Sequence, residues 1–397
     1  MNKNTMFAIF FCAVFLQAGA YGLTFMLPRL FESLGSDEKA VGTMLMFTAL
    51  ATLVSVYYVG HLSDAIGRVR MLALACIAIA VALALYAVAE SVGGMIFTAS
   101  VFLGFGWGIT YALCPVVLTK LVPNELGIRF FTFLSIAVMT GFGLSPVLAA
   151  VLQSFGLTLN TAFYVSSAFC VISATMFWLI DQPIENHSTI DNISQKSKIT
   201  LNTVKAVFQS PAWRPLTMVF LGASVFAGVT NFQTVYADER DLTYSDYFLV
   251  YTMTVVMFRF VLARFSGGKN PYHTIAMLQY VMGGSVIFFC FISGNDYHYW
   301  LFAVLFGIGY GVSYPILVAM AAKDADKDLV AQTLQLFAFS YFAGIFGFPL
   351  IAGWMIVEIG SNVLLTLIAF LAAIEASLAL SRAIIVGKKI QRDCSGF

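Results

Sequence analysis

Apolar runs of about 20 residues recur along the whole chain, separated by short polar segments. A helix of about this length crosses a hydrocarbon core and satisfies its backbone hydrogen bonds internally. The pattern therefore predicts twelve membrane-spanning helices. Their expected ranges are 5–28, 40–60, 71–90, 94–119, 127–152, 158–180, 214–237, 246–265, 272–293, 299–322, 330–357 and 361–386.

The composition fits a polytopic membrane protein and excludes several soluble classes. Of the 397 residues, 60% are hydrophobic and only 10% are charged, against about 25% charged in soluble domains. The 21 basic and 20 acidic residues balance, so no nucleic-acid partner is expected. The four His and six Cys residues have no zinc-type spacing, so neither a metal nor another cofactor is expected.

A long hydrophilic stretch divides the predicted spans into two groups of six. We expect an N-terminal bundle over 1–180, a central loop over 181–213, a C-terminal bundle over 214–390 and a tail over 391–397. If the N-terminus is inside, only Arg29, Lys39 and Arg240 of the 21 Lys and Arg residues fall outside. By the positive-inside rule, both termini and the central loop are expected in the cytoplasm.

The two halves match each other at an offset of 203 residues. Segment 104–111 aligns without a gap on segment 307–314, and the same offset pairs Gly141 with Gly344 and Pro146 with Pro349. A single register across neighbouring spans indicates parallel repeats, related by an axis along the membrane normal. The expected fold class is all-α, with twelve spans in two six-helix bundles.

The repeated segments are rich in small residues. Glycines four positions apart allow helix backbones to approach closely. Segment 309–311 also resembles part of a potassium-filter loop, but it lies within a full-length span, so packing is the preferred interpretation. The expected packing residues are Gly104, Gly108, Gly141, Pro146, Gly307, Gly311, Gly344 and Pro349.

The turn after the second span carries the most specific motif. Residues 60–70 read Gly-His-Leu-Ser-Asp-Ala-Ile-Gly-Arg-Val-Arg, which resembles the G-x-L-(S/A)-D-x-x-G-R signature of the major facilitator superfamily. With twelve spans, a parallel repeat and a long central loop, the resemblance covers essentially the whole chain. It implies a secondary transporter that moves a small-molecule substrate across a lipid bilayer by alternating access between two bundles.

The resemblance implies that the acidic residue and the Arg of this motif latch the cytoplasmic side. A helix is expected to begin near Val330, and its free amides would favour a nearby carboxylate such as Asp64. The alternative is a charged turn that caps the third helix. In the second half, Gly267 stands where Asp64 would be, so the second latch is degenerate. The expected gate residues are Gly60, Asp64, Gly67, Arg68, Arg70 and Arg259, the last of which snorkels or supports the gate.

In this family the first, fourth, seventh and tenth helices line the central cavity. Their polar mid-span residues are candidates for substrate contact, and all are uncharged, although Ser and Thr can also satisfy their hydroxyls on their own helix. The candidates are Gln17, Tyr21, Thr24, Thr110, Tyr111, Asn231, Gln233, Ser313 and Tyr314. Such a cavity suits a small amphipathic or polar organic molecule, for example a drug-like compound, a sugar or a siderophore.

The sequence leaves the coupling ion open. Ser100 stands where many family antiporters carry an Arg, so proton coupling through that position is unsupported. Glu375, inside the twelfth span, is expected to pack rather than to couple. The acidic residues Glu32, Asp238 and Glu239 are expected to be solvated loop charges.

Residues 141–150 resemble an element of family exporters, although Ser145, Ala149 and Ala150 replace glycines. We therefore expect a monomeric, proton-coupled exporter in the inner membrane, with uptake or uniport as the alternative. A channel or a sensor with this fold is a third possibility. An enzyme is disfavoured, because all four His residues fall in loops or at span ends and no metalloprotease motif is present.

Overall fold

The computed structural model describes residues 3–122, 127–187, 200–262 and 270–395, and within these ranges the chain is helical without β-strands. The first half contains α1 (Lys3–Gly22), α2 (Leu27–Ser33), α3 (Glu38–Ile66), α4 (Arg68–Val88), α5 (Gly94–Leu121), α6 (Gly127–Ser154) and α7 (Leu159–His187). The second half contains α8 (Leu201–Gln209), α9 (Trp213–Thr230), α10 (Gln233–Asp238), α11 (Tyr244–Leu262), α12 (Pro271–Phe289), α13 (Asp296–Asp324), α14 (Val330–Phe342), α15 (Phe348–Glu358) and α16 (Ser361–Ser395).

Within the described residues, every predicted span coincides with a helix or with helices joined by a short turn; residues 263–265 of the eighth span lie outside them. The first span is α1 and α2 with a 3₁₀ turn, Leu23–Met26, between them; the eleventh is α14 and α15 joined by a π-turn, Ala343–Gly347. The π-turn ends two residues before Pro349. A proline ring clashes with the carbonyl four residues earlier, and proline has no backbone N–H to donate. The π-turn therefore allows the helical span to continue through the proline position.

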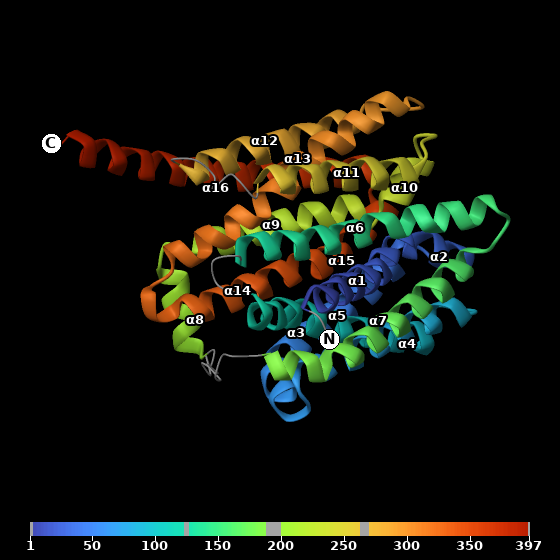
Figure 1. Ribbon diagram of the computed structural model, residues 1–397. Coiled ribbons are helices and arrows are strands. Elements are labelled where there is room, and N and C mark those ends of the chain that lie inside the picture. Colours follow the sequence, from blue (N-terminus) through green and yellow to red (C-terminus); the bar gives the residue numbers. More distant parts are fainter. Residues whose placement is uncertain (1–2, 123–126, 188–199, 263–269, 396–397) are drawn as a thin grey trace.

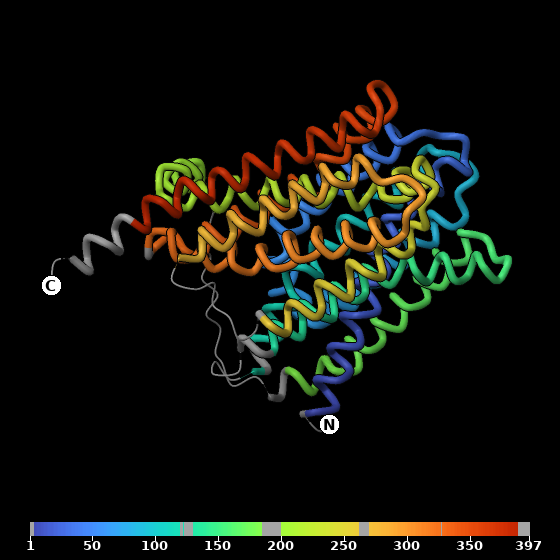
Figure 2. The backbone as a smooth tube through the Cα atoms, turned by 90° about the horizontal axis from the view of Figure 1, so that it is seen from above, coloured from blue at the N-terminus to red at the C-terminus, as the bar shows by residue number. Residues whose placement is uncertain are grey.

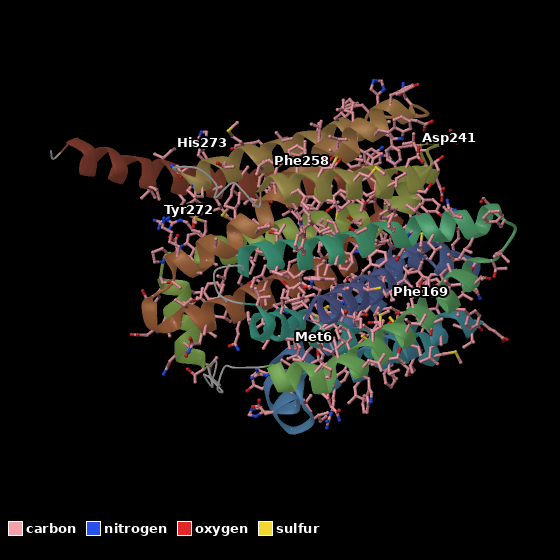
Figure 3. The ribbon with its side chains drawn as sticks, viewed as in Figure 1. Met6, Phe169, Asp241, Phe258, Tyr272 and His273 are labelled. Carbon is pink, nitrogen blue, oxygen red and sulfur yellow. The ribbon has the colours of Figure 1, made fainter. Side chains whose placement is uncertain are left out.

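The long helices lie side by side, and α8 crosses them at one end (Figure 1). Helices α8 and α9 meet at 95°. We call the end with α8 and the C-terminal end of α16 the termini side, and the end with α2 and α10 the far side. Because α1 runs toward α2, its N-terminal end faces the termini side. The backbone trace in Figure 2 shows both chain ends there, and Figure 3 shows Tyr272 and His273 at the opposite end of the molecule from Asp241.

The outer surface is strongly apolar. Leu179, Val261 and Phe291 have exposed fractions of 66%, 65% and 83%. A soluble protein would not expose so many large side chains, whereas hydrocarbon tails solvate them. Among the described helices, nine are long and apolar enough to cross a membrane, and ten if the bent α8–α9 pair is one span.

The two halves pack in the same way, as parallel repeats require. A Cβ atom on Gly104 of α5 would lie 2.2 Å from the carbonyl oxygen of Thr48 on α3. In the second half, Gly307 of α13 lies against Tyr251 of α11. Both members of the second pair are 203 residues after the members of the first. Small residues thus bring the same two helices together in each bundle.

Candidate substrate cavity and gates

A cavity of about 900 Å³ lies between the two bundles. Residues of α1, α5 and α6 line it on one side, and residues of α11, α13 and α14 on the other. Its wall reaches from Gln17, in the second half of α1, and Trp107, in the middle of α5, to Thr119 and Phe131, near the termini-side ends of α5 and α6. The cavity therefore opens toward the termini side.

Aromatic rings close the inner end of the cavity. Tyr21 stacks on Trp107 with ring centroids 4.2 Å apart, and it also contacts Phe142 at 5.1 Å. Farther toward the far side, Phe25 stacks on Phe248 of the other bundle at 5.5 Å. These rings fill the space between the bundles and separate the cavity from the far side.

Two tyrosines from equivalent positions of the repeat meet in the cavity wall. Tyr111 of α5 and Tyr314 of α13 are hydrogen-bonded to each other through their hydroxyls and are 203 residues apart. Tyr341 of α14 stacks on Tyr111 at 5.7 Å and contacts Tyr314 at 5.3 Å. The pair of hydroxyls thus joins the two bundles near the axis that relates them.

Four of the nine predicted substrate residues line this cavity: Gln17, Thr110, Tyr111 and Tyr314. Tyr21 lies directly behind them in the aromatic layer. Thr24, Asn231 and Gln233 are buried on the closed far side, where Gln233 donates to the hydroxyl of Tyr299 at 2.7 Å. Ser313 is buried away from the cavity, between the Nε2 of Gln279, from which it accepts, and the carbonyl of Tyr310, to which it donates.

The structure places residues in the cavity that the sequence interpretation did not assign to it. Tyr310 and Tyr341 line it, and so does Arg259 of α11, which has an exposed fraction of 6%. Arg259 donates from Nη1 to the carbonyl oxygen of Ser135 on α6 at 3.1 Å. The expectation that only uncharged side chains line the cavity is therefore corrected. A signal for Tyr310 existed, since it lies one helical turn from Tyr314 and so on the same face.

Ion pairs hold the bundles together at the far side. Arg29 of α2 binds Asp238 of α10 at 2.5 Å and places its guanidinium 4.5 Å from the ring centre of Tyr244. Lys39 of α3 binds Glu358 of α15. Asp238 is exposed to solvent, but it lies at the end of α10 and has an ion-pair partner in the other bundle, which the sequence did not indicate.

Glu239 also has partners in the structure. It pairs with Arg240 at 3.1 Å and accepts a hydrogen bond from the hydroxyl of Ser361. These contacts lie within the second bundle, and they hold α10 against the start of α16.

On the termini side, the motif residues form the turn between α3 and α4. Gly67 has a φ of +98°, a conformation that favours glycine, and it ends α3 and begins α4. Arg70 binds Asp181 of α7 at 2.7 Å, within its own bundle, while Asp64 is exposed. The predicted degenerate second latch, residues 263–269, lies outside the described residues.

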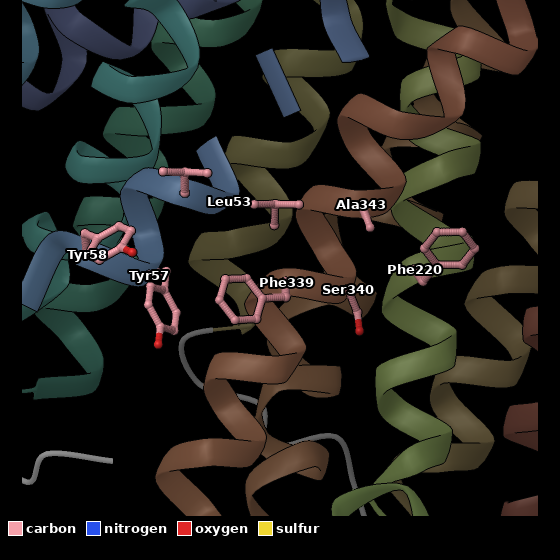
Figure 4. Close-up of a pocket in the computed structure, with 8 residues that line it drawn as sticks. Leu53, Tyr57, Tyr58, Phe220, Phe339, Ser340 and Ala343 are labelled. Carbon is pink, nitrogen blue, oxygen red and sulfur yellow. The ribbon is translucent and has the colours of Figure 1, made fainter. Parts of the chain in front are cut away.

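A lateral groove separates the bundles along the second half of α3. It has a volume of about 580 Å³, and Figure 4 shows Leu53, Tyr57 and Tyr58 of α3 facing Phe339 and Ser340 of α14 across it. The two bundles are thus separated both at the cavity mouth and at this groove.

Two further predicted positions lie away from the cavity wall. Ser100 is buried and hydrogen-bonded to the hydroxyl of Tyr86 at 2.8 Å. Glu375 of α16 is fully buried against Gly222 of α9, and neither carboxyl oxygen has a hydrogen-bond partner among the described residues. It lies inside the second bundle rather than at its lipid-facing surface.

Comparison with known proteins assigns the family. The model of the Major Facilitator Superfamily matches residues 9–349, most of the chain. A search of the curated proteins gives no match. The chain belongs to the Major Facilitator Superfamily and is a multi-pass membrane transporter of solutes rather than an enzyme.

Solved structures show the same fold at low sequence identity. The nucleoside transporter NupG is 15% identical, with a TM-score of 0.71 over 95% of this chain and 99% of that chain. A POT family transporter in complex with 5-aminolevulinic acid is 14% identical, with a TM-score of 0.73 over 96% of each chain. The human organic anion transporter MFSD10 is 14% identical, with a TM-score of 0.68 over 96% of this chain and 100% of that chain. At these identities the likeness extends to the fold alone.

Proposed function

We propose that this chain is a monomeric secondary transporter of the inner membrane that exports a small amphipathic organic molecule in exchange for protons. The observation that carries the proposal is the cavity between the bundles, open on the termini side and closed by ion pairs and aromatic rings on the far side. A single cavity that is closed at one end is the arrangement alternating access requires.

The polarity and size of the cavity support a small organic substrate. A volume of about 900 Å³ lies in the range of sites for drug-sized molecules. Tyr111, Tyr314 and Tyr341 offer ring faces and hydroxyls together, which suits a molecule with both an apolar body and a polar group. By their titles, the similar structures include a nucleoside transporter, a POT family transporter in complex with a thioalcohol conjugated peptide, and an organic anion transporter. The compounds that these titles name are organic molecules.

The orientation of the protein in the membrane and the direction of transport are inferred from the sequence. The distribution of Lys and Arg supports a cytoplasmic termini side, so the described conformation would be open to the cytoplasm. The resemblance of residues 141–150 to an element of family exporters supports export. Uptake or uniport of the same kind of molecule is the alternative outcome of the test.

Inside-out membrane vesicles that contain the protein test this function. The vesicles hold an imposed proton gradient reported by a pH dye, and drugs, sugars and siderophores are added one at a time. We expect a saturable, protein-dependent collapse of the gradient with at least one class of compound. Accumulation of labelled compound in right-side-out vesicles, without any response of the dye, would instead assign uptake or uniport.

Asp64→Asn is expected to slow transport without affecting folding. In the conformation closed on the termini side, the carboxylate would bind the free amides at the start of α14, where no side chain caps the helix. An interaction of this kind contributes about 0.3–2 kcal/mol. Removing the charge therefore changes the population ratio of the two conformations by roughly twofold to 30-fold. Turnover per inserted protein, measured in reconstituted vesicles, is the readout.

Glu90→Gln is the control for this prediction, because it removes an exposed carboxylate on the far side. Its turnover should stay near that of the wild type. Near-normal turnover of Asp64→Asn would refute the latch assignment and leave the helix-capping turn as its role.

A further inference from the structure

Arg259 is the one charged side chain among the described residues that line the cavity. It is buried, and the backbone carbonyl of Ser135 accepts a hydrogen bond from one of its terminal nitrogens. Its Nε has no hydrogen-bond partner within the described ranges. The ion pairs found in the described part of the chain do not include it.

A buried charge of this kind needs a counter-ion. Arginine keeps its charge because the guanidinium does not lose its proton in proteins. An unpaired charge at membrane depth is strongly unfavourable, and such residues pair with one another or face a water-filled pathway. The described cavity wall supplies no carboxylate, so the favourable partner is an anion that enters the cavity.

The surroundings of Arg259 suit one particular kind of anion. Tyr310, Tyr314 and Tyr341 line the same cavity and carry hydroxyls, which can donate to a carboxylate. The indole Nε1 of Trp107 is a further donor without a partner among the described residues. The ring faces of the same side chains provide an apolar surface for the rest of the molecule.

We propose that the substrate is an amphipathic organic anion whose carboxylate binds Arg259 and whose apolar body lies against the tyrosines of the cavity. The guanidinium presents two parallel N–H donors that match a carboxylate. A single Arg accommodates one negative charge, and it disfavours cationic compounds. This inference rests on the proposed transport function, because it names the substrate class of that same cavity.

Quenching of Trp107 fluorescence tests the charge preference without any substrate or transport. In a variant with the other four tryptophans (Trp178, Trp213, Trp300 and Trp354) replaced by phenylalanine, iodide reports access of an anion and acrylamide reports access of a neutral molecule. Arg259→Gln should lower the iodide quenching constant about threefold or more, because the positive potential of the cavity is removed. The acrylamide constant should not change.

Two matched variants separate charge from shape. Arg259→Lys keeps the positive charge and should retain iodide quenching. Arg214→Gln removes a positive charge at the start of α9, outside the residues that line the cavity, and should leave both constants unchanged. An iodide constant that is the same in the wild type and in Arg259→Gln would overturn the proposal.

Competition in transport tests the carboxylate itself. Naphthalene-1-acetate and its uncharged counterpart naphthalene-1-acetamide are compared as inhibitors of whichever panel compound moves. The acid should inhibit about tenfold better than the amide in the wild type, and Arg259→Gln should abolish this preference. Arg259→Lys should reduce it, since an ammonium lacks the paired donors.

The outcomes distinguish failure of the anion proposal from failure of the proposed transport function. Equal inhibition by acid and amide, with transport intact, would overturn the anion proposal and leave the transport function standing. If no panel compound moves in any vesicle, the proposed function fails, and the iodide result still decides whether the cavity selects anions.

Discussion

Gly353→Val is expected to hold the far side open and to reduce turnover about 100-fold. A Cβ atom on Gly353 of α15 would lie 2.1 Å from the backbone carbonyl oxygen of Glu38 on α3. The reciprocal contact places a Cβ on Gly42 only 2.3 Å from the carbonyl oxygen of Pro349. Both contacts join the two bundles, so an added side chain opposes closure without disturbing the packing inside either bundle.

The size of this effect follows from the overlap. Backbone atoms cannot give way as flexible side chains can, and overpacking of this kind costs about 3 kcal/mol. A shift of about 3 kcal/mol changes the ratio of two conformations by roughly 100-fold. The conformation closed on the far side then becomes a minor species, and the transport cycle cannot be completed at its normal rate.

Thiol accessibility measures the opened far side directly. Thr24→Cys, in a background without other cysteines, is buried on the closed far side in the described conformation. We expect a membrane-impermeant maleimide to label it rapidly when Gly353→Val is present and slowly when it is absent. Gly347→Val is the matched control, because a Cβ there meets no atom within 4 Å. Slow labelling of Thr24→Cys in the Gly353→Val variant would contradict the prediction that the added side chain holds the far side open.

Gly104→Val is expected to act on folding instead of gating. A Cβ on Gly104 would lie 2.2 Å from the carbonyl oxygen of Thr48, and both residues belong to the first bundle. The hydroxyl of Thr52 also donates to the carbonyl of Gly104 at 3.0 Å, so the two helices cannot separate without losing this bond. We expect a loss of stability of about 3 kcal/mol or more.

Thermal unfolding and size-exclusion profiles of the detergent-solubilised protein provide the measurement for Gly104→Val. The variant should show a lower unfolding temperature and an aggregated fraction. Gly284→Val is the control, since a Cβ at this helical position meets open space. A normal unfolding temperature for Gly104→Val would show that α3 and α5 are not packed as described.

The spans and the repeat could be predicted because both depend on the local order of residues. Twenty apolar residues can satisfy their backbone in lipid only as a helix, and the offset of 203 already pairs Tyr111 with Tyr314. The helix breaks could not be predicted in the same way. The π-turn before Pro349 keeps an apolar composition, so hydropathy continues across it. The turn at residues 231–232, Asn-Phe, lies inside a predicted span with apolar residues on both sides, so its polar residue alone does not mark a break.

The cavity could be predicted only in part, because the sequence does not state how each helix is rotated. Tyr314 and Ser313 are neighbours, yet successive residues of a helix point about 100° apart. Tyr314 therefore faces the cavity while Ser313 faces α12. Arg259 was expected near a gate, and only the packing of α11 against α6 shows that it reaches the cavity.

The far-side ion pairs show a second limit. Arg29 and Asp238 are 209 residues apart and lie in different bundles. Neither residue belongs to a motif, and each lies close to a loop in the sequence, so no local pattern marks the two as partners. Their pairing depends on how the two bundles meet, which hydropathy does not encode.

Two distances measured in one sample test alternating access most directly. Spin labels at Glu32 and Asp296 span the bundles on the far side, and labels at His61 and Lys323 span them on the termini side; all four residues are exposed. Pulsed electron paramagnetic resonance in lipid nanodiscs then compares the wild type with Gly353→Val. We expect the far-side distance to lengthen and the termini-side distance to shorten in the variant. Distances that stay the same, or that change together, would contradict a cavity opened alternately to the two sides.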